Sequence, residues 1–292
     1  MVGLLVGRVA IVSGAGRGIG RGEALALAHE GAMVVVNDVD ESCALSVVAE
    51  IESRGGHAVA DDTDITNFDA VEALVKQIDD RFGSLDIVVN NAGILRDRML
   101  VNMTEREWDD VVSVHLKGTF CLTKHAAARW RQRAKAGETI YGRVINTTSV
   151  AGLCVSVGQA NYGAAKAGIA SFTLNCAAEL SAIGVTVNAI APGALTRMTE
   201  NLPGAPTKAP EGMFDKFDPE NVAPIVAWLA SEEAAHITGH VLESSYGVLS
   251  LFTGWQRHAV VAKEGRFEVG ELAEVVEKLR QGAPEPAQLT PV

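Results

Sequence analysis

Cysteine, proline and aromatic residues are scarce in this chain, which has neither a basic surplus nor a long apolar run. Its cysteines form no CxxC pair and show no zinc-like spacing, so we expect reduced thiols and no metal site. These cysteines are Cys43, Cys121, Cys154 and Cys176. No stretch approaches the roughly 20 apolar residues of a membrane span. The formal net charge of −11 argues against nucleic acid and anionic membranes as partners.

The amino-terminal residues Met1–Val12 are apolar, but they lack the basic segment and the small-residue cleavage site of a secretory signal. We interpret them as the first strand and expect a cytoplasmic protein. The composition, 48% hydrophobic and 21% charged over 292 residues, is that of a globular protein with ample core.

Apolar runs of strand length alternate with helical segments along most of the chain. The strand-like runs are rich in β-branched residues: Arg8–Ser13, Met33–Asn37, His57–Ala60, Leu85–Asn90, Arg143–Thr147 and Val185–Ile190. The helical segments between them are Gly18–Glu30, Glu41–Arg54, Asn67–Phe82, Thr104–Arg133 and Ala160–Ser181. This alternation predicts an α/β fold, a doubly wound parallel sheet with right-handed crossovers, in a single domain over residues 1–253.

Two segments depart from the alternation. Residues 194–217 hold Pro203, Pro206 and Pro210 just beyond a strand, and we expect them to form a lid over a substrate site. Residues 254–292 form an extension that we expect to pack on the same domain, with a frayed end over Gly282–Val292. The extension carries a helical apolar stripe formed by Val269, Leu272, Val275, Val276 and Leu279.

A glycine-rich turn follows the first strand and opens the first helix. Gly14, Gly16, Gly18 and Gly20 alternate there with other residues, among them Arg17 and Ile19. Glycines let the backbone approach phosphates closely, and the amides of a helix start bind anions. The context therefore predicts a dinucleotide site in a Rossmann-type fold, although the spacing is Gly-x-x-x-Gly-x-Gly.

Two residues near this turn give opposite indications of which dinucleotide binds. Asp38 ends the second strand, where a carboxylate accepts hydrogen bonds from ribose hydroxyls and repels a 2′-phosphate. Arg17 is a guanidinium beside the turn that could meet such a phosphate. We give Asp38 the greater weight because its charge lies at the ribose edge, so NAD is favoured over NADP.

The ends of the third and fourth strands supply further candidates for the cofactor site. Asp64 and Ile65 follow the third strand, where they could flank the adenine ring. Asn91, Ala92 and Gly93 follow the fourth strand and could line the cleft. Taken singly, each segment is also an ordinary turn.

Acid–base chemistry is indicated by Tyr162 and Lys166, which share one face of a predicted helix, with Ser149 thirteen residues before Tyr162. An ammonium near a phenol favours its ionised form, so we expect Lys166 to lower the pKa of Tyr162 toward working pH. Together with the dinucleotide turn, this predicts hydride chemistry on an alcohol or a carbonyl.

The glycine turn, the Asn90–Gly93 segment, Ser149 and the Tyr-x-x-x-Lys pair resemble, in this order, the short-chain dehydrogenase/reductase family of the classical type. The resemblance covers roughly the first 250 residues. It implies that Ser149 orients the substrate oxygen, that Tyr162 moves its proton and that Lys166 holds the nicotinamide ribose. It also implies that Pro192, Gly193 and Thr196 lie at the nicotinamide end of the cofactor.

One position departs from the family pattern. His115 occupies the place on the long helix where the family usually has an asparagine as a fourth catalytic residue. Either a local main-chain carbonyl does that work, which a histidine permits, or the histidine side chain changes the proton relay. An ordinary helix residue is the third interpretation.

Several segments are similar to one branch of the family, the (3R)-hydroxyacyl-CoA dehydrogenase domain of peroxisomal multifunctional enzymes. These are Val114–Gly118, Asn91–Arg98 and Gly158–Tyr162. The branch uses NAD, and Arg96 and Arg98 either meet CoA phosphates or belong to a solvated loop. The segment Leu242–Gly247 departs from the usual acidic-Gly-Gly turn. The resemblance implies a stand-alone bacterial enzyme.

The resulting hypothesis is an NAD-dependent oxidoreductase that interconverts a secondary alcohol and a ketone, with a 3-hydroxyacyl thioester as substrate. A hydroxysteroid dehydrogenase and an NADPH-dependent 3-oxoacyl reductase are the alternatives among enzymes. Outside the enzymes, the alternative is a dinucleotide-binding regulator, which the intact Ser149, Tyr162 and Lys166 disfavour. The family resemblance further implies a homo-tetramer or homo-dimer formed through the helices Thr104–Arg133 and Ala160–Ser181.

Overall fold

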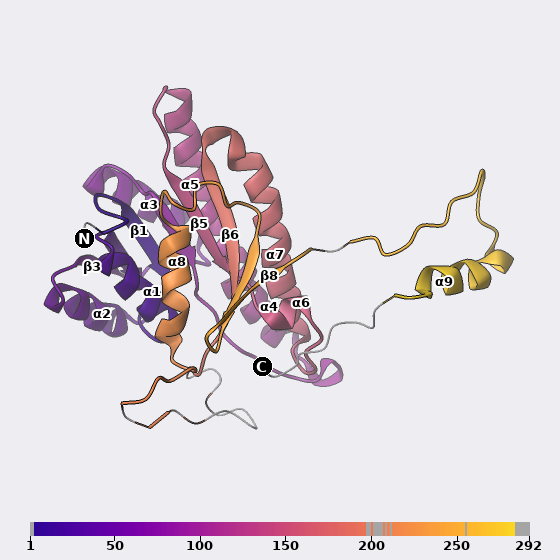
Figure 1. Cartoon of the computed structure of the whole chain (residues 1–292). Helices are drawn as coiled ribbons and strands as arrows, with labels where there is room; N and C mark the ends of the chain where they lie inside the picture. Colours follow the sequence, from indigo (N-terminus) through magenta and orange to yellow (C-terminus); the bar gives the residue numbers. More distant parts are fainter. Residues whose placement is uncertain are drawn as a thin grey trace.

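The computed structural model describes residues 3–196, 200, 207, 209–210, 212–254 and 256–283. In this part of the chain, eight strands form one sheet in the order β3-β2-β1-β4-β5-β6-β7-β8 (Figure 1). They are β1 (Val9–Ser13), β2 (Met33–Asn37), β3 (His57–Asp61), β4 (Ile87–Asn90), β5 (Gly142–Thr147), β6 (Val185–Gly193), β7 (Val241–Ser245) and β8 (Val248–Phe252). The pairs from β3 to β7 are parallel and β8 is antiparallel, which confirms the predicted doubly wound α/β fold.

Helices cover both faces of the sheet. The apolar side chains of α1, α2 and α8 pack in one core cluster, and those of α3, α5 and α7 pack in the other. The helices are α1 (Gly18–His29), α2 (Glu41–Ser53), α3 (Phe68–Phe82), α4 (Glu105–Val112), α5 (Gly118–Lys135), α6 (Val150–Leu153), α7 (Ala160–Leu180), α8 (Ala223–Leu229) and α9 (Leu272–Arg280). Strands between two such clusters have both faces buried, which accounts for their continuous valine and isoleucine runs.

The starts and ends of several helices follow their predicted signals. Thr104 accepts a hydrogen bond from the Glu107 amide at 3.2 Å, and the Glu107 carboxylate accepts one from the Thr104 amide at 2.9 Å. Gly83 ends α3 in the left-handed conformation, with φ of 89°. The helix expected to run unbroken from Thr104 to Arg133 is instead divided by a π-helical turn over Ser113–Lys117.

The region after β6 contains elements that the sequence pattern did not predict, namely α8 and the β7–β8 hairpin. Tyr246 and Gly247 join the two strands with φ of 54° and 84°. Two consecutive positive φ values define a tight hairpin turn, in which Tyr246 is strained because it carries a side chain. Tyr246 packs edge-on against Phe217, with 5.1 Å between ring centroids.

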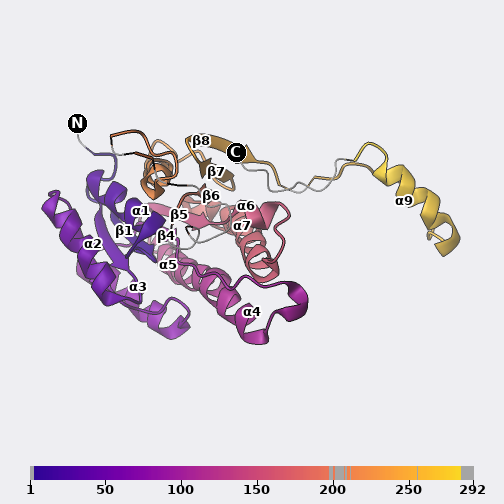
Figure 2. The ribbon, with the colours of Figure 1, turned by 90° about the horizontal axis from the view of Figure 1, so that it is seen from below.

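The carboxyl-terminal helix α9 lies away from the sheet at the end of an extended segment (Figures 1 and 2). The predicted Glu274–Lys278 ion pair is present at 2.7 Å. The arrangement differs from the expected packing on the same domain, because an apolar stripe requires a partner surface but does not identify it. The end expected to be frayed lies mostly outside the described residues, and part of the expected lid also lies outside them.

The part of the chain that the structure describes includes no helix that is long and apolar enough to cross a membrane. It also holds no cluster of three or more potential metal ligands. All four cysteines are free thiols.

Candidate active site and cofactor cleft

A cleft of about 770 Å³ opens at the carboxyl ends of the strands, where doubly wound sheets bind their ligands. Most of the predicted cofactor residues line it: Gly14, Arg17, Gly18, Ile19, Gly20, Asp38, Asp64, Ile65, Asn91, Ala92, Gly93 and Thr196. Sequence reasoning missed other lining residues: Asn37, Val39, Asp40, Thr63, Thr66, Ile94, Leu95, Arg96 and Val114. Each lies close in the sequence to a predicted residue. Their position after the ends of strands was the signal that could have identified them as cleft residues.

The glycine turn is held against the end of β4. The Asn91 side-chain amide donates hydrogen bonds to the carbonyls of Ser13 at 3.0 Å and Gly14 at 3.1 Å. A Cβ on Gly20 would lie 2.3 Å from the Asn91 amide nitrogen, and one on Gly14 would lie 2.7 Å from Ala92 Cα. Both glycines are therefore required by close backbone approach, and Gly14 also by its φ of 63°.

Asp38 braces this turn from the end of β2. One of its carboxylate oxygens accepts a hydrogen bond from the Gly16 amide at 3.0 Å, and the other accepts one from the Asp40 amide at 3.0 Å. Gly16 does not line the cleft itself. It fits closely against Asp38, because a Cβ there would lie 2.7 Å from a carboxylate oxygen.

Arg17 lies beside Asp40 at the same end of the cleft. Its guanidinium donates to an Asp40 carboxylate oxygen at 2.7 Å and to Cys43 Sγ at 2.8 Å. Hydrogen bonds from Ser42 and Cys43 hold the pKa of Asp40 well below its ordinary value, so this carboxylate stays charged. The guanidinium charge is thus matched locally by an anion.

The three predicted acid–base residues are not among the residues that line this cleft. Ser149 caps α6 and accepts a hydrogen bond from the Ala151 amide at 3.1 Å. Tyr162 and Lys166 lie on α7, with Lys166 Nζ 5.6 Å from the centre of the Tyr162 ring. Nζ donates to the Thr147 carbonyl at 2.6 Å, which draws the ammonium toward the end of β5.

The electrostatics of Tyr162 differ from the prediction. Burial raises the pKa of its phenol, while a hydrogen bond with Ser149 lowers it and the charge of Asp97 raises it. Burial also lowers the pKa of Lys166, against a raising effect from Glu23. Desolvation therefore opposes both charged forms, and the pKa of the Tyr162 phenol lies above its ordinary value.

His115 is buried in the π-helical turn and touches Tyr162. The two rings meet edge-on with centroids 5.1 Å apart. Burial lowers the pKa of His115 to about 3, with a further lowering by the charge of Lys166, so the imidazole is neutral at ordinary pH. Its Nε2 lies 2.7 Å from the Ile94 carbonyl oxygen and 3.0 Å from the Ile94 amide nitrogen, so the ring is held against the backbone of Ile94. The residue therefore contacts the acid–base group as a neutral ring.

Asn161 fixes the loop between the cleft and Tyr162. Its side-chain amide donates to the carbonyls of Arg96 and Glu107, each at 3.0 Å. Arg98 pairs with Glu107 at 2.9 Å and Arg96 lies 3.6 Å from Asp110. Both arginines thus have acidic neighbours, so the loop is less available to phosphates than its sequence indicated.

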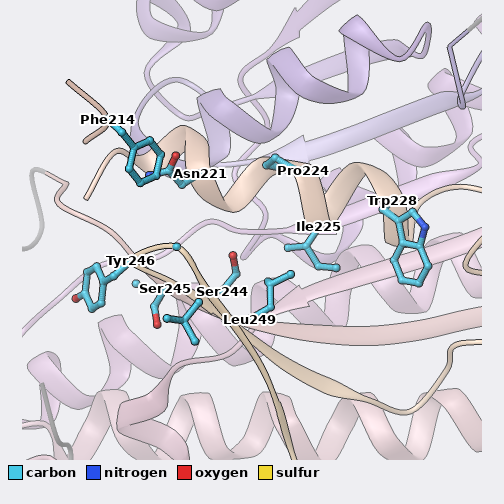
Figure 3. A pocket seen from close by; sticks show the side chains of 12 residues that line it. Phe214, Asn221, Pro224, Ile225, Trp228, Ser244, Ser245, Tyr246 and Leu249 are labelled. Carbon is cyan, nitrogen blue, oxygen red and sulfur yellow. The ribbon is translucent and has the colours of Figure 1, made fainter. Parts of the chain in front are cut away.

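Pro192 and Gly193 end β6, where they pair with Ser244 and Ser245 of β7. Neither residue lines the cofactor cleft. Residues of α8 and the β7–β8 hairpin form a second, apolar groove of about 510 Å³ that includes Gly193 (Figure 3).

The family model of short chain dehydrogenases matches residues 8–206. The chain is a short-chain dehydrogenase. It is therefore an NAD(P)-dependent oxidoreductase that acts on CH–OH groups, and its fold agrees with this assignment.

Known proteins resemble this dehydrogenase over most of its length. It is 49% identical over 244 residues to hydroxyacyl-CoA dehydrogenase ChsB1 of Mycobacterium tuberculosis, covering 81% of this chain and 77% of that protein. A 3-oxoacyl-[acyl-carrier-protein] reductase of Synechocystis is 44% identical over 248 residues, 84% of this chain and 98% of that one. The peroxisomal multifunctional enzyme type 2 of Mus musculus is 42% identical over 261 residues, 85% of this chain but 32% of the longer enzyme.

A solved structure agrees with the fold of this dehydrogenase. A short chain dehydrogenase from Mycobacterium avium has a TM-score of 0.90 and 48% sequence identity. The match covers 99% of this chain and 100% of that one.

The cleft of this dehydrogenase fits a dinucleotide. Any side chain at Gly14 or Gly20 would collide with Ala92 or Asn91, so the turn is bare where phosphates approach. Asp38 offers carboxylate oxygens at the ribose end. These residues would hold the cofactor, which supplies hydride acceptance or donation when it is bound.

Substitution of Gly20 by valine should reduce dinucleotide affinity sharply and lower stability by about 1–3 kcal/mol. The added side chain must displace Asn91, and with it the carbonyls of the glycine turn. Isothermal titration with NAD and thermal unfolding would measure both effects. Gly254→Ala is the matched control, because a Cβ there meets no atom within 4 Å. Unchanged NAD affinity in Gly20→Val would contradict the assignment of this cleft.

Proposed function

We propose that this protein is an NAD-dependent dehydrogenase that interconverts a 3-hydroxyacyl thioester and the corresponding 3-oxoacyl thioester. The observation that carries the NAD preference is the acidic ribose end of the cleft. Asp38 and Asp40 both line it, and the guanidinium of Arg17 is engaged by Asp40 at 2.7 Å. A 2′-phosphate would meet two carboxylates there and an arginine that already has an anionic partner.

In the proposed reaction, Ser149 holds the substrate oxygen and Tyr162 exchanges a proton with it. In the oxidation direction the alcohol would give its hydroxyl proton to the Tyr162 phenolate, which becomes a neutral phenol. A nicotinamide bound in the cleft would supply acceptance of the carbinol hydride, so that the alcohol becomes a ketone. Charged Lys166 stabilises the phenolate that starts this cycle. His115, neutral and in edge contact with the Tyr162 ring, limits the ring's position without supplying a proton.

The substrate class is supported by the relatives. One relative, from M. tuberculosis, is named a hydroxyacyl-CoA dehydrogenase. Another, from M. musculus, is named a peroxisomal multifunctional enzyme. The reductases of Synechocystis and Staphylococcus aureus, at 44% and 42% identity, favour the second candidate, a 3-oxoacyl reductase. Both candidates act on the same β-carbon of an acyl thioester and differ in cofactor and direction.

The segment 194–217 is the proposed substrate lid of the single domain 1–253. Only parts of this segment belong to the described residues. In these parts, the two ends of the segment are joined by a hydrogen bond. The Leu195 amide donates to the Phe217 carbonyl at 2.8 Å, and Phe217 packs on Tyr246. A loop whose ends are joined in this way emerges beside the end of β6, where Gly193 and Thr196 lie.

NAD should stabilise the protein against thermal unfolding more than NADP at matched concentration, because binding to the folded state raises the melting temperature. Asp38→Asn should shift the ratio of NAD to NADP affinity toward NADP by about tenfold, about 1.4 kcal/mol. Asp62→Asn is the control, since Asp62 is exposed nearby and does not line the cleft. A larger rise with NADP in the wild type would favour the reductase.

Replacement of Tyr162 by phenylalanine should lower kcat by about 10² to 10⁴-fold, the usual contribution of a general acid–base group. Dinucleotide affinity should stay within about twofold, because the substitution removes only the hydroxyl. Steady-state assays with 3-hydroxyacyl thioesters and a binding titration would separate the two effects. A fully active Tyr162→Phe variant would contradict the mechanism. Much faster turnover of steroid alcohols than of acyl thioesters by the unmodified enzyme would contradict the substrate class.

The enzyme is further proposed to assemble as a homo-dimer or homo-tetramer through α4, α5 and α7. Exposed apolar side chains on these three helices support this assembly: Trp108, Phe120 and Leu174. Phe120 also contacts Phe68 and Phe172, with ring centroids 6.0 Å and 6.5 Å away. Aromatic clusters that reach the surface are enriched at interfaces between chains.

Phe120→Glu should convert the assembled enzyme to a smaller species, because it places a charge in the proposed interface. Size-exclusion chromatography with light scattering would give the mass of each form. Val6→Glu alters another exposed apolar residue, at the amino end of the sheet, and should leave the mass unchanged. A monomeric wild type would contradict this part of the proposal.

A further inference from the structure

The residue directly before Ser149 is a buried polar one. Thr148 is only 1% exposed and follows β5 at the point where the chain leaves the sheet. Its amide donates a hydrogen bond to the Ile190 carbonyl of β6 at 2.7 Å, so its backbone is still held by the sheet. A hydroxyl buried at this depth costs stability unless it has a hydrogen-bond partner. The partner that it has therefore indicates what the side chain holds in place.

The Thr148 hydroxyl bonds to the backbone of Lys166. Its Oγ1 donates to the Lys166 carbonyl oxygen at 2.7 Å, in a buried setting. The side chain of the same lysine returns to the strand, because Lys166 Nζ donates to the Thr147 carbonyl at 2.6 Å. Two consecutive residues at the end of β5 are thus joined to the main chain and to the side chain of one residue on α7.

The short helix that begins at Ser149 also packs directly on Lys166. Ser149 is the N-cap of α6, and its carbonyl accepts a hydrogen bond from the Gly152 amide at 2.9 Å. A Cβ on Gly152 would lie 2.6 Å from the Ala167 amide nitrogen and 2.7 Å from the Lys166 carbonyl carbon. The backbones of α6 and α7 therefore meet with no side chain between them. Contacts with Lys166 flank Ser149 on both sides in the sequence.

We propose that Thr148 is a positioning residue of the acid–base site, whose hydroxyl sets the place of Ser149 relative to Tyr162 and Lys166. The inference deepens the proposed function and rests on it for its kinetic consequences, because Ser149 is the residue that would hold the substrate oxygen. Tyr162 lies one helical turn before Lys166 on α7, so a strand end that is fixed at Lys166 is also fixed relative to Tyr162. A displacement of about 1 Å between reacting groups can cost about 10²-fold in rate.

A second threonine joins the same strand to the same helix and serves as the matched control. The Thr173 hydroxyl accepts a hydrogen bond from the Asn146 side-chain amide at 2.9 Å and donates one to the Ile169 carbonyl at 2.8 Å. Thr173 is as deeply buried as Thr148, but it lies about two helical turns beyond Lys166. A role in packing β5 against α7 would be shared by both threonines, whereas a role in the acid–base site belongs to Thr148 alone.

The kinetic test compares Thr148→Val, which removes the hydroxyl and keeps the branched shape, with Thr148→Ser, which keeps the hydroxyl. With a 3-hydroxyacyl thioester and NAD, Thr148→Val should lower kcat by about 10- to 100-fold and leave the KM for NAD within about twofold. Thr148→Ser should recover most of the lost kcat. If the valine variant folds poorly, Thr148→Ala replaces it.

Thr173→Val should lower the melting temperature by about 2 to 4 °C, at least as much as Thr148→Val does, because each loses a buried hydrogen bond. Its kcat should stay within about twofold of the wild-type value, since the acid–base residues keep their contacts. Equal losses of kcat in the two valine variants would reduce Thr148 to a packing role and overturn the inference.

A spectroscopic readout tests the place of Ser149 without turnover. The chain has three tyrosines, so protein labelled with carbon-13 at tyrosine Cζ gives three NMR signals, of which Tyr162→Phe identifies one. The Tyr162 phenol shares a hydrogen bond with Ser149, so Ser149→Ala should shift the Tyr162 signal at neutral pH. Thr148→Val should shift this signal in the same direction, and Thr173→Val should leave it in place.

The two readouts separate this inference from the proposed function. A shifted Tyr162 signal in Thr148→Val, found in a protein that oxidises no hydroxyacyl thioester, would refute the proposed substrate and keep the role of Thr148. Undiminished thioester turnover in Thr148→Val, with an unmoved Tyr162 signal, would keep the function and overturn the inference.

Discussion

The close approach of the glycine turn to the end of β4 is the constraint on which the rest of the site depends. Gly14 and Gly20 leave no room for a side chain, and the Asn91 amide spans the remaining gap by bonding two carbonyls of the turn. This contact fixes the start of α1. It therefore also fixes the position of Ile19, which lines the cleft.

Burial is the second organising effect, because it shifts the pKa values of Tyr162 and of several groups near it. It raises the pKa of Tyr162, lowers those of Lys166 and His115, and raises that of Glu23. Charged forms in such a site exist only where a partner of opposite sign offsets desolvation. At the ribose end of the cleft the groups are more exposed, and Arg17 and Asp40 pair there in the ordinary way.

Much of the fold followed from sequence patterns whose physical cause is local. The valine-rich strands, the Thr104 capping box and the Gly83 helix end each depend on residues within a few positions of one another. The π-helical turn at His115 and the strained Tyr246–Gly247 hairpin were not predicted. Each includes a ring contact with a residue that is distant in the sequence: His115 contacts Tyr162, and Tyr246 contacts Phe217.

The sequence by itself determined the class of fold, because the alternation of strands and helices suffices for it. Spacing and residue type also led to the proposed dinucleotide turn and to the proposed roles of Ser149, Tyr162 and Lys166. Only the tertiary structure decided which ionisable groups pair with one another and which are buried. In the sequence, Arg17 could meet a phosphate, whereas in the structure its guanidinium is paired with Asp40. Which groups share a buried volume depends on how distant elements pack, and desolvation in that volume, rather than residue type, sets their protonation.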